Sequence, residues 1–185
     1  MSRCPPWLLV VPRWVYRRLR KRLMSTRRMG AFTVKPVDAK DQGLFARRGY
    51  EPGAWILPIT GRRVAGRGEY TIQLDATTHI EPDAPLRFSN HSCTPNMGIK
   101  TDSAGRPGFY AMRRIQRGEE LTWDYAMSEL DFDCEGSPQS FPCACGTHNC
   151  RGLIERGWQG LSPELQRLYR EWVMPYLRTV ETHED

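Results

Sequence analysis

Three cysteines lie within eight residues of one another, at Cys143, Cys145 and Cys150. Thiolate sulfur is a usual ligand of structural Zn²⁺, which takes four ligands in a tetrahedron. The spacing therefore predicts three corners of a zinc site, and the competing interpretation is three reduced structural cysteines without metal. The candidates for the fourth ligand are His148, Cys134, Cys4 and Cys93. Spacing alone leaves all four open.

A second stretch, residues 87–96, reads RFSNHSCTPN. It has no apolar periodicity, so it resembles neither a buried strand nor an amphipathic helix. Most of its side chains donate or accept hydrogen bonds or can ligate a metal. We interpret this stretch as a binding site around which the chain is organised.

A third stretch, residues 118–125, reads GEELTWDY. The alternation of Leu121 and Trp123 predicts a short strand that ends in Tyr125, which places a phenol where the strand meets a loop. The alternative for such a residue is a buried tyrosine with a satisfied hydroxyl.

Charge is distributed unevenly along the 185 residues. The net charge is +6, yet residues 1–29 hold nine Lys or Arg and no acid, which leaves 18 basic and 21 acidic side chains in the remainder. The tail could form a basic amphipathic helix that touches nucleic acid or an anionic membrane; the alternatives are a disordered tail, an upstream extension or a targeting peptide. Residues 118–150 hold seven acids and no Lys or Arg, which predicts a field that attracts a basic peptide, unless the run is a solvated loop.

The six cysteines follow no secretory signal and no apolar stretch of about 20 residues occurs. We therefore expect an intracellular protein, which would be cytoplasmic or, in a eukaryote, nuclear. We also expect a monomer. Clustered cysteines in that setting favour metal over disulfides.

Short apolar segments separated by Gly, Pro and Asp predict a mostly β (α+β) domain without βαβ units. The predicted strands are 32–37, 44–46, 55–60, 70–74, 97–101 and 109–112, with a hairpin turn at 102–105. Ser162 and Pro163 predict the start of a C-terminal helix whose apolar stripe continues to Leu177, packs on the domain and is kinked or ended by Pro175. An oligomer contact is the alternative for that stripe.

Together these motifs resemble the SET domain of protein-lysine methyltransferases. The resemblance rests on RFSNHSCTPN, GEELTWDY and the CxCx₄C post-SET element at 143–150, in this order, with 42–46 and 53–57 similar to the opening strands. It implies a β-clip fold with knot-like threading, a post-SET zinc loop and a C-terminal helix. The implied organisation is a tail at 1–29, a SET domain at 30–127, an acidic linker and zinc element at 128–157, and a C-terminal helix and tail at 158–185.

The resemblance also implies the site. S-adenosylmethionine would be bound by Gln42, Gly43, Leu44, Arg87, Phe88, Asn90, His91 and Leu153. The catalytic set would be Tyr125 at the point of methyl transfer, with Trp123 and Tyr70 as aromatic walls of the lysine channel. One structural Zn²⁺ would be held by Cys93, Cys143, Cys145 and Cys150.

Two positions depart from the family pattern. Asp41-Gln42-Gly43 stands where Gly-x-Gly is usual, and Trp123 stands where Phe or Tyr is usual. We expect methyl transfer from S-adenosylmethionine to lysine in a basic, histone-like or nucleic-acid-associated protein. The competing hypotheses are an inactive SET-like module that binds lysine and a zinc-containing nucleic-acid binder that depends on the tail.

Overall fold

The computed structural model of the chain describes residues 26–38, 40–68, 70–131 and 140–179. Its strands are β1 (Arg27–Met29), β2 (Phe32–Val37), β3 (Asp41–Ala46), β4 (Trp55–Pro58), β5 (Gly61–Val64), β6 (Ile72–Gln73), β7 (His79–Pro82), β8 (Asn90–His91), β9 (Met97–Thr101), β10 (Pro107–Ala111), β11 (Thr122–Trp123), β12 (Ser140–Pro142) and β13 (Leu153–Glu155). Its helical elements are α2 (Pro163–Tyr169) and the 3-10 turns η1 (Leu86–Phe88), η2 (Tyr125–Met127), η3 (Gly157–Gly160), η4 (Arg170–Trp172) and η5 (Pro175–Thr179). The predictions for the basic tail, Cys4 and Cys134 fall outside the described residues.

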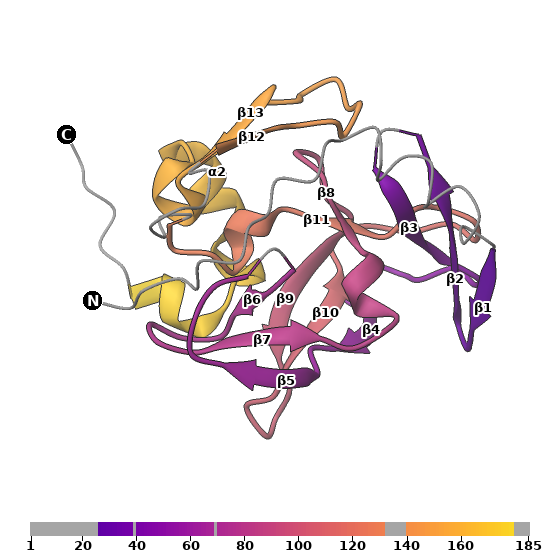
Figure 1. The fold of residues 1–185 in the computed structure, drawn as a ribbon, viewed down its shortest axis with the longest axis horizontal. Helices are drawn as coiled ribbons and strands as arrows, with labels where there is room; N and C mark the ends of the chain where they lie inside the picture. The colour runs from indigo at the N-terminus through magenta and orange to yellow at the C-terminus, as the bar shows by residue number, and fades with distance from the viewer. Residues whose placement is uncertain (1–25, 39, 69, 132–139, 180–185) are drawn as a thin grey trace, which may run out of the picture.

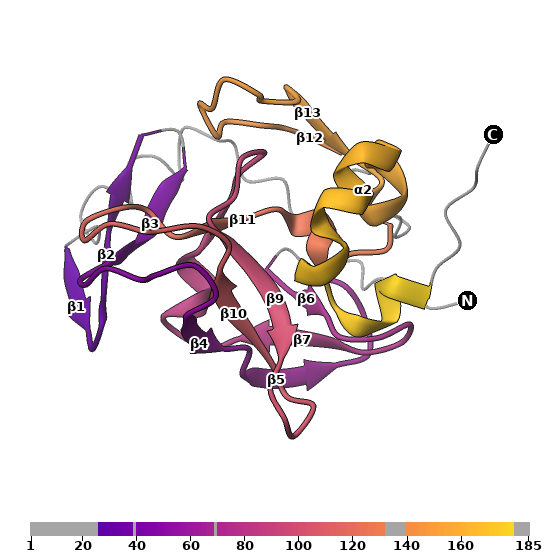
Figure 2. The same cartoon turned by 180° about the vertical axis from the view of Figure 1, so that it is seen from behind.

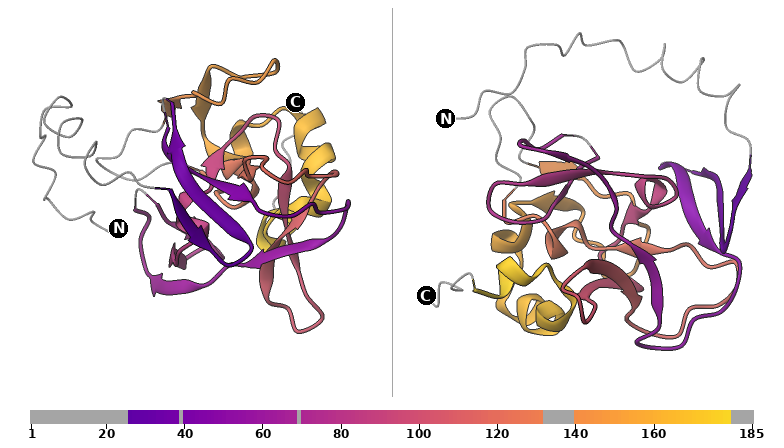
Figure 3. Two further views of the ribbon diagram at one scale, coloured as in Figure 1. Left: turned by 90° about the vertical axis from the view of Figure 1, so that its right-hand side faces the viewer. Right: turned by 90° about the horizontal axis from the view of Figure 1, so that it is seen from below.

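The strands form small sheets, which confirms the predicted mostly β class (Figure 1). The sheet β1-β2-β3 lies at one end of the molecule and α2 lies towards the other, with β4-β10-β9 between them, as the view from behind also shows (Figure 2). The β12–β13 hairpin lies at the opposite edge from the sheet β5-β7-β6 (Figure 1 and Figure 3).

Most of the predicted strands are present with small shifts at their ends. β2 and β9 have the predicted bounds, whereas the strand predicted at 70–74 contracts to β6, two residues long. The hairpin turn between β9 and β10 is confirmed, because the Gly105 amide donates to the Asp102 carbonyl at 2.9 Å and Gly105 has a φ of +76°. That φ is favourable for glycine and unfavourable for residues with a Cβ.

Residues 90–96 are bonded at both ends to β11, which comes thirty residues later in the chain. β8 pairs with β11 in parallel, and the Asn96 amide donates to the Thr122 carbonyl at 3.1 Å. The Asn96 side chain is almost fully buried and accepts from the Thr122 amide at 2.9 Å. Its Nδ2 donates to the Glu120 carbonyl at 2.7 Å and to Glu119 Oε1 at 3.0 Å. These bonds fix the two central motifs against each other.

The predicted long C-terminal helix is wrong in length. The α-helix ends at Tyr169, and the chain continues as 3-10 turns on either side of a break before Pro175. The apolar stripe still packs on the domain: Trp172 lies against Gly98 of β9, where a Cβ would come within 2.6 Å of the Trp172 Cβ. Leu168 is the exception, with 64% of its surface exposed.

The main core lies between the sheets and the C-terminal turns. Its fully buried members include Leu44, Met97, Ile99, Phe109, Leu121 and Leu177. Within the described residues, no helix is both long and apolar enough to cross a membrane.

Candidate active site and metal centre

Asn90 brings the first strands to the central motif. Its Nδ2 donates to the Gln42 carbonyl and to Glu120 Oε1, both at 2.8 Å. Glu120 in turn pairs with Lys40 at 3.3 Å. At Gly43, a Cβ would lie 2.7 Å from Val37 Cγ2 and 2.8 Å from Glu120 Oε1, so a larger residue would require these side chains to shift. The structure therefore brings together Gln42, Gly43 and Asn90, as the cofactor prediction requires.

Asp41 accounts for the departure from Gly-x-Gly. It has a φ of +64°, in the left-handed region that favours glycine. Aspartate tolerates this region better than most residues with a side chain. The backbone at Asp41 therefore adopts a left-handed conformation that would be less strained with glycine. The aspartate side chain does not prevent this conformation.

Tyr125 begins the turn η2 instead of ending a strand. The preceding Asp124 caps this turn, because its carboxylate accepts from the Ala126 amide at 3.1 Å. The Tyr125 hydroxyl donates to the Ser89 carbonyl at 3.4 Å. Burial is the main effect that raises the pKa of Tyr125 to about 12, so the phenol stays neutral near pH 7.

The three predicted catalytic residues line one pocket. Trp123 is held there by its Nε1, which donates to Ser89 Oγ at 3.1 Å, and by an edge contact with Phe109 at 5.1 Å between ring centroids. Tyr70 is half exposed at the mouth. The pocket lining is Arg67, Gly68, Tyr70, Thr71, Ile72, Pro82, Leu86, Arg87, Ser89, Trp123, Tyr125 and Glu129.

The remaining predicted cofactor residues lie at different distances from this centre. Leu44 is fully buried in β3, and Phe88 is half-buried against the core. The Arg87 guanidinium lies 5.9 Å from the Tyr70 ring and lines the pocket with the aromatic residues. Leu153 is 42% exposed on β13 and is not part of the pocket lining.

His91 lies between Tyr125 and Cys93. Its Nδ1 accepts from the Tyr125 amide at 3.3 Å, and its Nε2 lies 3.4 Å from the Cys93 sulfur. Burial, followed by the charges of Arg151 and Lys40, lowers the pKa of His91 to about 3. The imidazole is therefore neutral, with its proton on Nε2, directed at the sulfur.

The four predicted zinc ligands come together. The sulfur atoms of Cys93, Cys143, Cys145 and Cys150 all lie within 4.8 Å of one another. The Cys93 and Cys143 sulfurs are 3.7 Å apart, and a tetrahedron with Zn–S bonds of about 2.3 Å has sulfur-to-sulfur edges of about 3.8 Å. The donor set therefore fits Zn²⁺, with Cys93 as the fourth ligand, whereas His148 is exposed outside the cluster.

Arg151 links the cysteine cluster to the Tyr125 turn, a role that the sequence analysis did not assign. Its amide donates to the Cys93 sulfur at 3.4 Å, and its guanidinium lies 2.8 Å from the fully buried carboxylate of Asp124. The loop that contains the cysteine cluster and the cap of η2 are therefore held by one residue.

Among the described residues, four members of the acidic run each lie beside a cation: Glu119 beside Arg113, Glu120 beside Lys40, Asp124 beside Arg151 and Glu129 beside Arg67. These four charges are compensated within the chain. The field that attracts a basic peptide stays a prediction. Glu129 was missed as an individual residue; its position among the apolar residues of the run was the available signal.

Residues 41–126 match the family model described as SET domain. The histone-lysine N-methyltransferase, H3 lysine-4 specific, of Emericella nidulans is 41% identical over 133 residues, which cover 60% of this chain and 11% of that protein. The human histone-lysine N-methyltransferase 2B is 33% identical over 136 residues, which cover 61% of this chain and 5% of that protein. This chain thus spans a small part of each relative.

A solved structure with a similar fold is KRYPTONITE in complex with mCHH DNA, H3(1-15) peptide and SAH. It matches with a TM-score of 0.52 at 28% identity, over 66% of this chain and 28% of that chain.

Proposed function

We propose, from the premise that residues 41–126 form a SET domain, that this chain transfers methyl groups from S-adenosylmethionine to the side-chain amine of lysine in a protein. The observation that carries the proposal is the convergence of Tyr70, Trp123 and Tyr125 on one pocket. The names of the relatives, histone-lysine N-methyltransferases, support the same activity.

The residues that would hold the methyl donor are those of the cradle around Gln42, Gly43 and Asn90, with Leu44, Arg87, Phe88, His91 and Leu153 as further contacts. S-adenosylmethionine, when bound, supplies a methyl group on a sulfonium that an amine can displace in line. The fit is supported by the bond from the Asn90 side chain to the Gln42 carbonyl, which brings these residues together, and by the SAH in the structural neighbour.

The aromatic walls favour the neutral form of the lysine amine. A free lysine has a pKa of about 10.4, so the pocket has to favour the neutral amine. Trp123 is buried and excludes water from the inner end, and desolvation lowers the pKa of an amine. The neutral Tyr125 hydroxyl and the Ser89 carbonyl orient the amine for attack. We assign no residue as a general base.

The same comparisons support a substrate class. A basic, histone-like tail is the candidate, supported by the H3 peptide in the structural neighbour and the H3 specificity named for the fungal relative. A single structural Zn²⁺ on the four cysteines would order the loop that contains Arg151.

Tyr125→Phe tests the assigned activity. We expect methylation of histone H3 tail peptides by the purified chain to fall at least about 100-fold, because one oriented hydroxyl at the transfer point is lost. Calorimetry should show unchanged affinity for S-adenosylmethionine. Tyr110→Phe, on β10 outside the pocket lining, is the matched control and should retain activity. Full turnover by Tyr125→Phe would contradict the role of Tyr125. A wild-type chain that binds lysine peptides without methylating any of them would instead indicate a binding module.

A further inference from the structure

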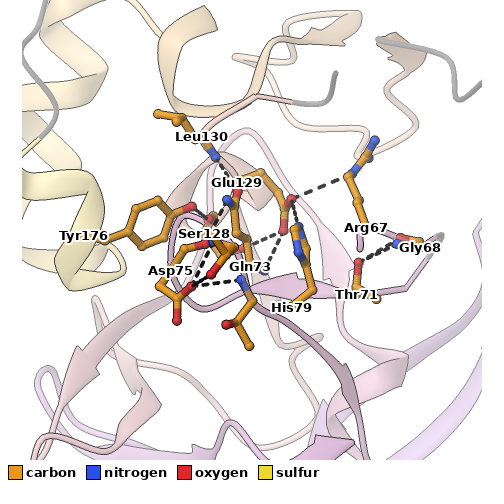
Figure 4. A network of polar contacts seen from close by, with 12 residues as sticks. Arg67, Gly68, Thr71, Gln73, Asp75, His79, Ser128, Glu129, Leu130 and Tyr176 are labelled. Carbon is orange, nitrogen blue, oxygen red and sulfur yellow. Dashed lines mark hydrogen bonds and ion pairs between the residues drawn. The ribbon is translucent and has the colours of Figure 1, made fainter. Parts of the chain in front are cut away.

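A buried polar network surrounds Glu129 at the side of the pocket (Figure 4). Glu129 is 3% exposed, and its Oε1 accepts from the Gln73 amide at 2.8 Å. The Gln73 side chain bonds to the next residue of the same segment, because its Oε1 accepts from the Leu130 amide at 3.0 Å. Two segments that are 56 residues apart are thus joined by bonds in both directions.

The first of these segments forms the outer wall of the pocket. β6 is the edge strand of its sheet and pairs with β7 at only two positions, Ile72 and Gln73. The chain just before it contains Tyr70 and Thr71, which line the pocket. Because β6 pairs with its sheet at only two positions, the hydrogen bond to Glu129 contributes much of the stabilisation of this segment.

The second segment continues from η2, the turn that begins at Tyr125. The Glu129 amide donates to the Tyr125 carbonyl at 3.1 Å, so Glu129 closes the turn that Tyr125 opens. Glu129 therefore spans the two walls between which a lysine side chain would lie.

The second carboxylate oxygen adds a charge effect. Oε2 lies 3.7 Å from both Arg67 Nε and His79 Nε2, and no hydrogen bond to it occurs among the described residues. Of the pocket-lining residues in the part of the chain that the structure describes, Glu129 alone is acidic. Its charge offsets that of Arg67 where a cationic lysine would enter.

We propose that Glu129 is a positioning residue for the acceptor lysine, which ties the Tyr70 wall to the Tyr125 turn and reduces the positive charge that Arg67 and Arg87 give the pocket. This inference rests on the proposed lysine methylation. It assigns Glu129 to peptide binding and leaves the methyl donor site, on the side of Asn90, unaffected.

Two substitutions separate the contributions. Glu129→Gln keeps an oxygen that can accept from Gln73 and removes the charge, so the KM for a histone H3 tail peptide should rise about threefold to fivefold, with a stronger dependence on salt. Glu129→Ala removes both, and that KM should rise at least about tenfold while kcat changes less than about threefold. The affinity for S-adenosylmethionine should remain within about twofold of the wild type in both.

Tyr176→Phe is the matched control. It removes the hydrogen bond from the Tyr176 hydroxyl to the Ser128 carbonyl, at 2.5 Å, and so loosens the same segment on the side away from the pocket. This variant should keep the wild-type KM. Hydrogen exchange should speed up at the Gln73 amide in Glu129→Ala and should not do so in the control.

Three results would overturn the proposal: an unchanged peptide KM in Glu129→Ala, a loss of donor affinity in proportion to the rise in KM, or an equal rise in KM in Tyr176→Phe. If Glu129→Ala does not fold, an unchanged KM in Glu129→Gln would refute the charge effect. Failure of the proposed function would look different, because the wild-type chain would then methylate no peptide at all.

Discussion

Replacement of Asn96 tests how the two central motifs are held together. Asn96→Ala removes two bonds donated by Nδ2 and one accepted by Oδ1, and leaves the backbone bond from the Asn96 amide to Thr122 in place. The Thr122 amide and the Glu120 carbonyl each lose a partner. Glu119 loses one donor but keeps its contact with Arg113.

The expected cost follows from the two backbone groups. An unsatisfied buried polar group costs about 1–3 kcal/mol, so the free energy of unfolding should fall by about 2–6 kcal/mol for the two groups. A domain of this size has a total of about 5–15 kcal/mol. With a urea m-value of about 2 kcal/mol/M, the unfolding midpoint should shift down by about 1–3 M, measured by tryptophan fluorescence.

Ser103→Ala, in the exposed hairpin turn, is the control for this experiment and should change the free energy of unfolding by less than about 0.5 kcal/mol. A loss below about 1 kcal/mol in Asn96→Ala would refute the reasoning, because it would mean that water or a rearranged backbone satisfies both groups.

Two further predictions concern the metal and pH. Metal analysis should find one zinc per chain and a clear loss of it in Cys93→Ser; full occupancy in that variant would exclude Cys93 as a ligand. Burial raises the pKa of Glu119, but bonds from Arg113, the Gln116 amide and Asn96 outweigh it and hold that pKa below its ordinary value of 4.5. The stabilisation from Glu119 is therefore present above pH 4.5 and is lost as the pH falls through the lowered pKa. The melting temperature of Glu119→Gln should change less between about pH 3 and 5 than that of the wild type. Identical pH profiles of the melting temperature in the two proteins would contradict this.

The fold was predictable where local signals agree. β2, β9 and the turn at Gly105 follow directly from short apolar segments separated by Gly, Pro and Asp and from turn chemistry. The C-terminal stripe predicted burial correctly but not helix length, because side chains three residues apart share a face in 3-10 turns as well as in an α-helix. The strand predicted at 70–74 is shorter in the structure, because the segment pairs with β7 only at Ile72 and Gln73, and no local pattern reveals the extent of that pairing.

The candidate site shows a different limit. The motifs indicated which residues to examine, and the four cysteines and the three aromatic residues do lie together. The contacts of Glu129 and Asn96 depend on pairings between segments far apart in sequence, so spacing contains no trace of them. Charge runs are normally solvated, and that general expectation concealed the buried carboxylates of Asp124 and Glu129.

The position of Arg151 predicts that the proposed methyl transfer depends on the proposed zinc site more than the zinc site depends on Tyr125. Its amide is directed at the Cys93 sulfur, and its guanidinium neutralises Asp124, which caps the turn of Tyr125. Opening of the loop that contains the cysteine cluster withdraws Arg151 and leaves the buried carboxylate of Asp124 without its cation, which is strongly unfavourable. The turn that presents Tyr125 must then rearrange. Removal of the Tyr125 hydroxyl, by contrast, breaks no bond to the cysteines. Loss of zinc should therefore abolish methyl transfer, whereas loss of the hydroxyl should leave zinc in place.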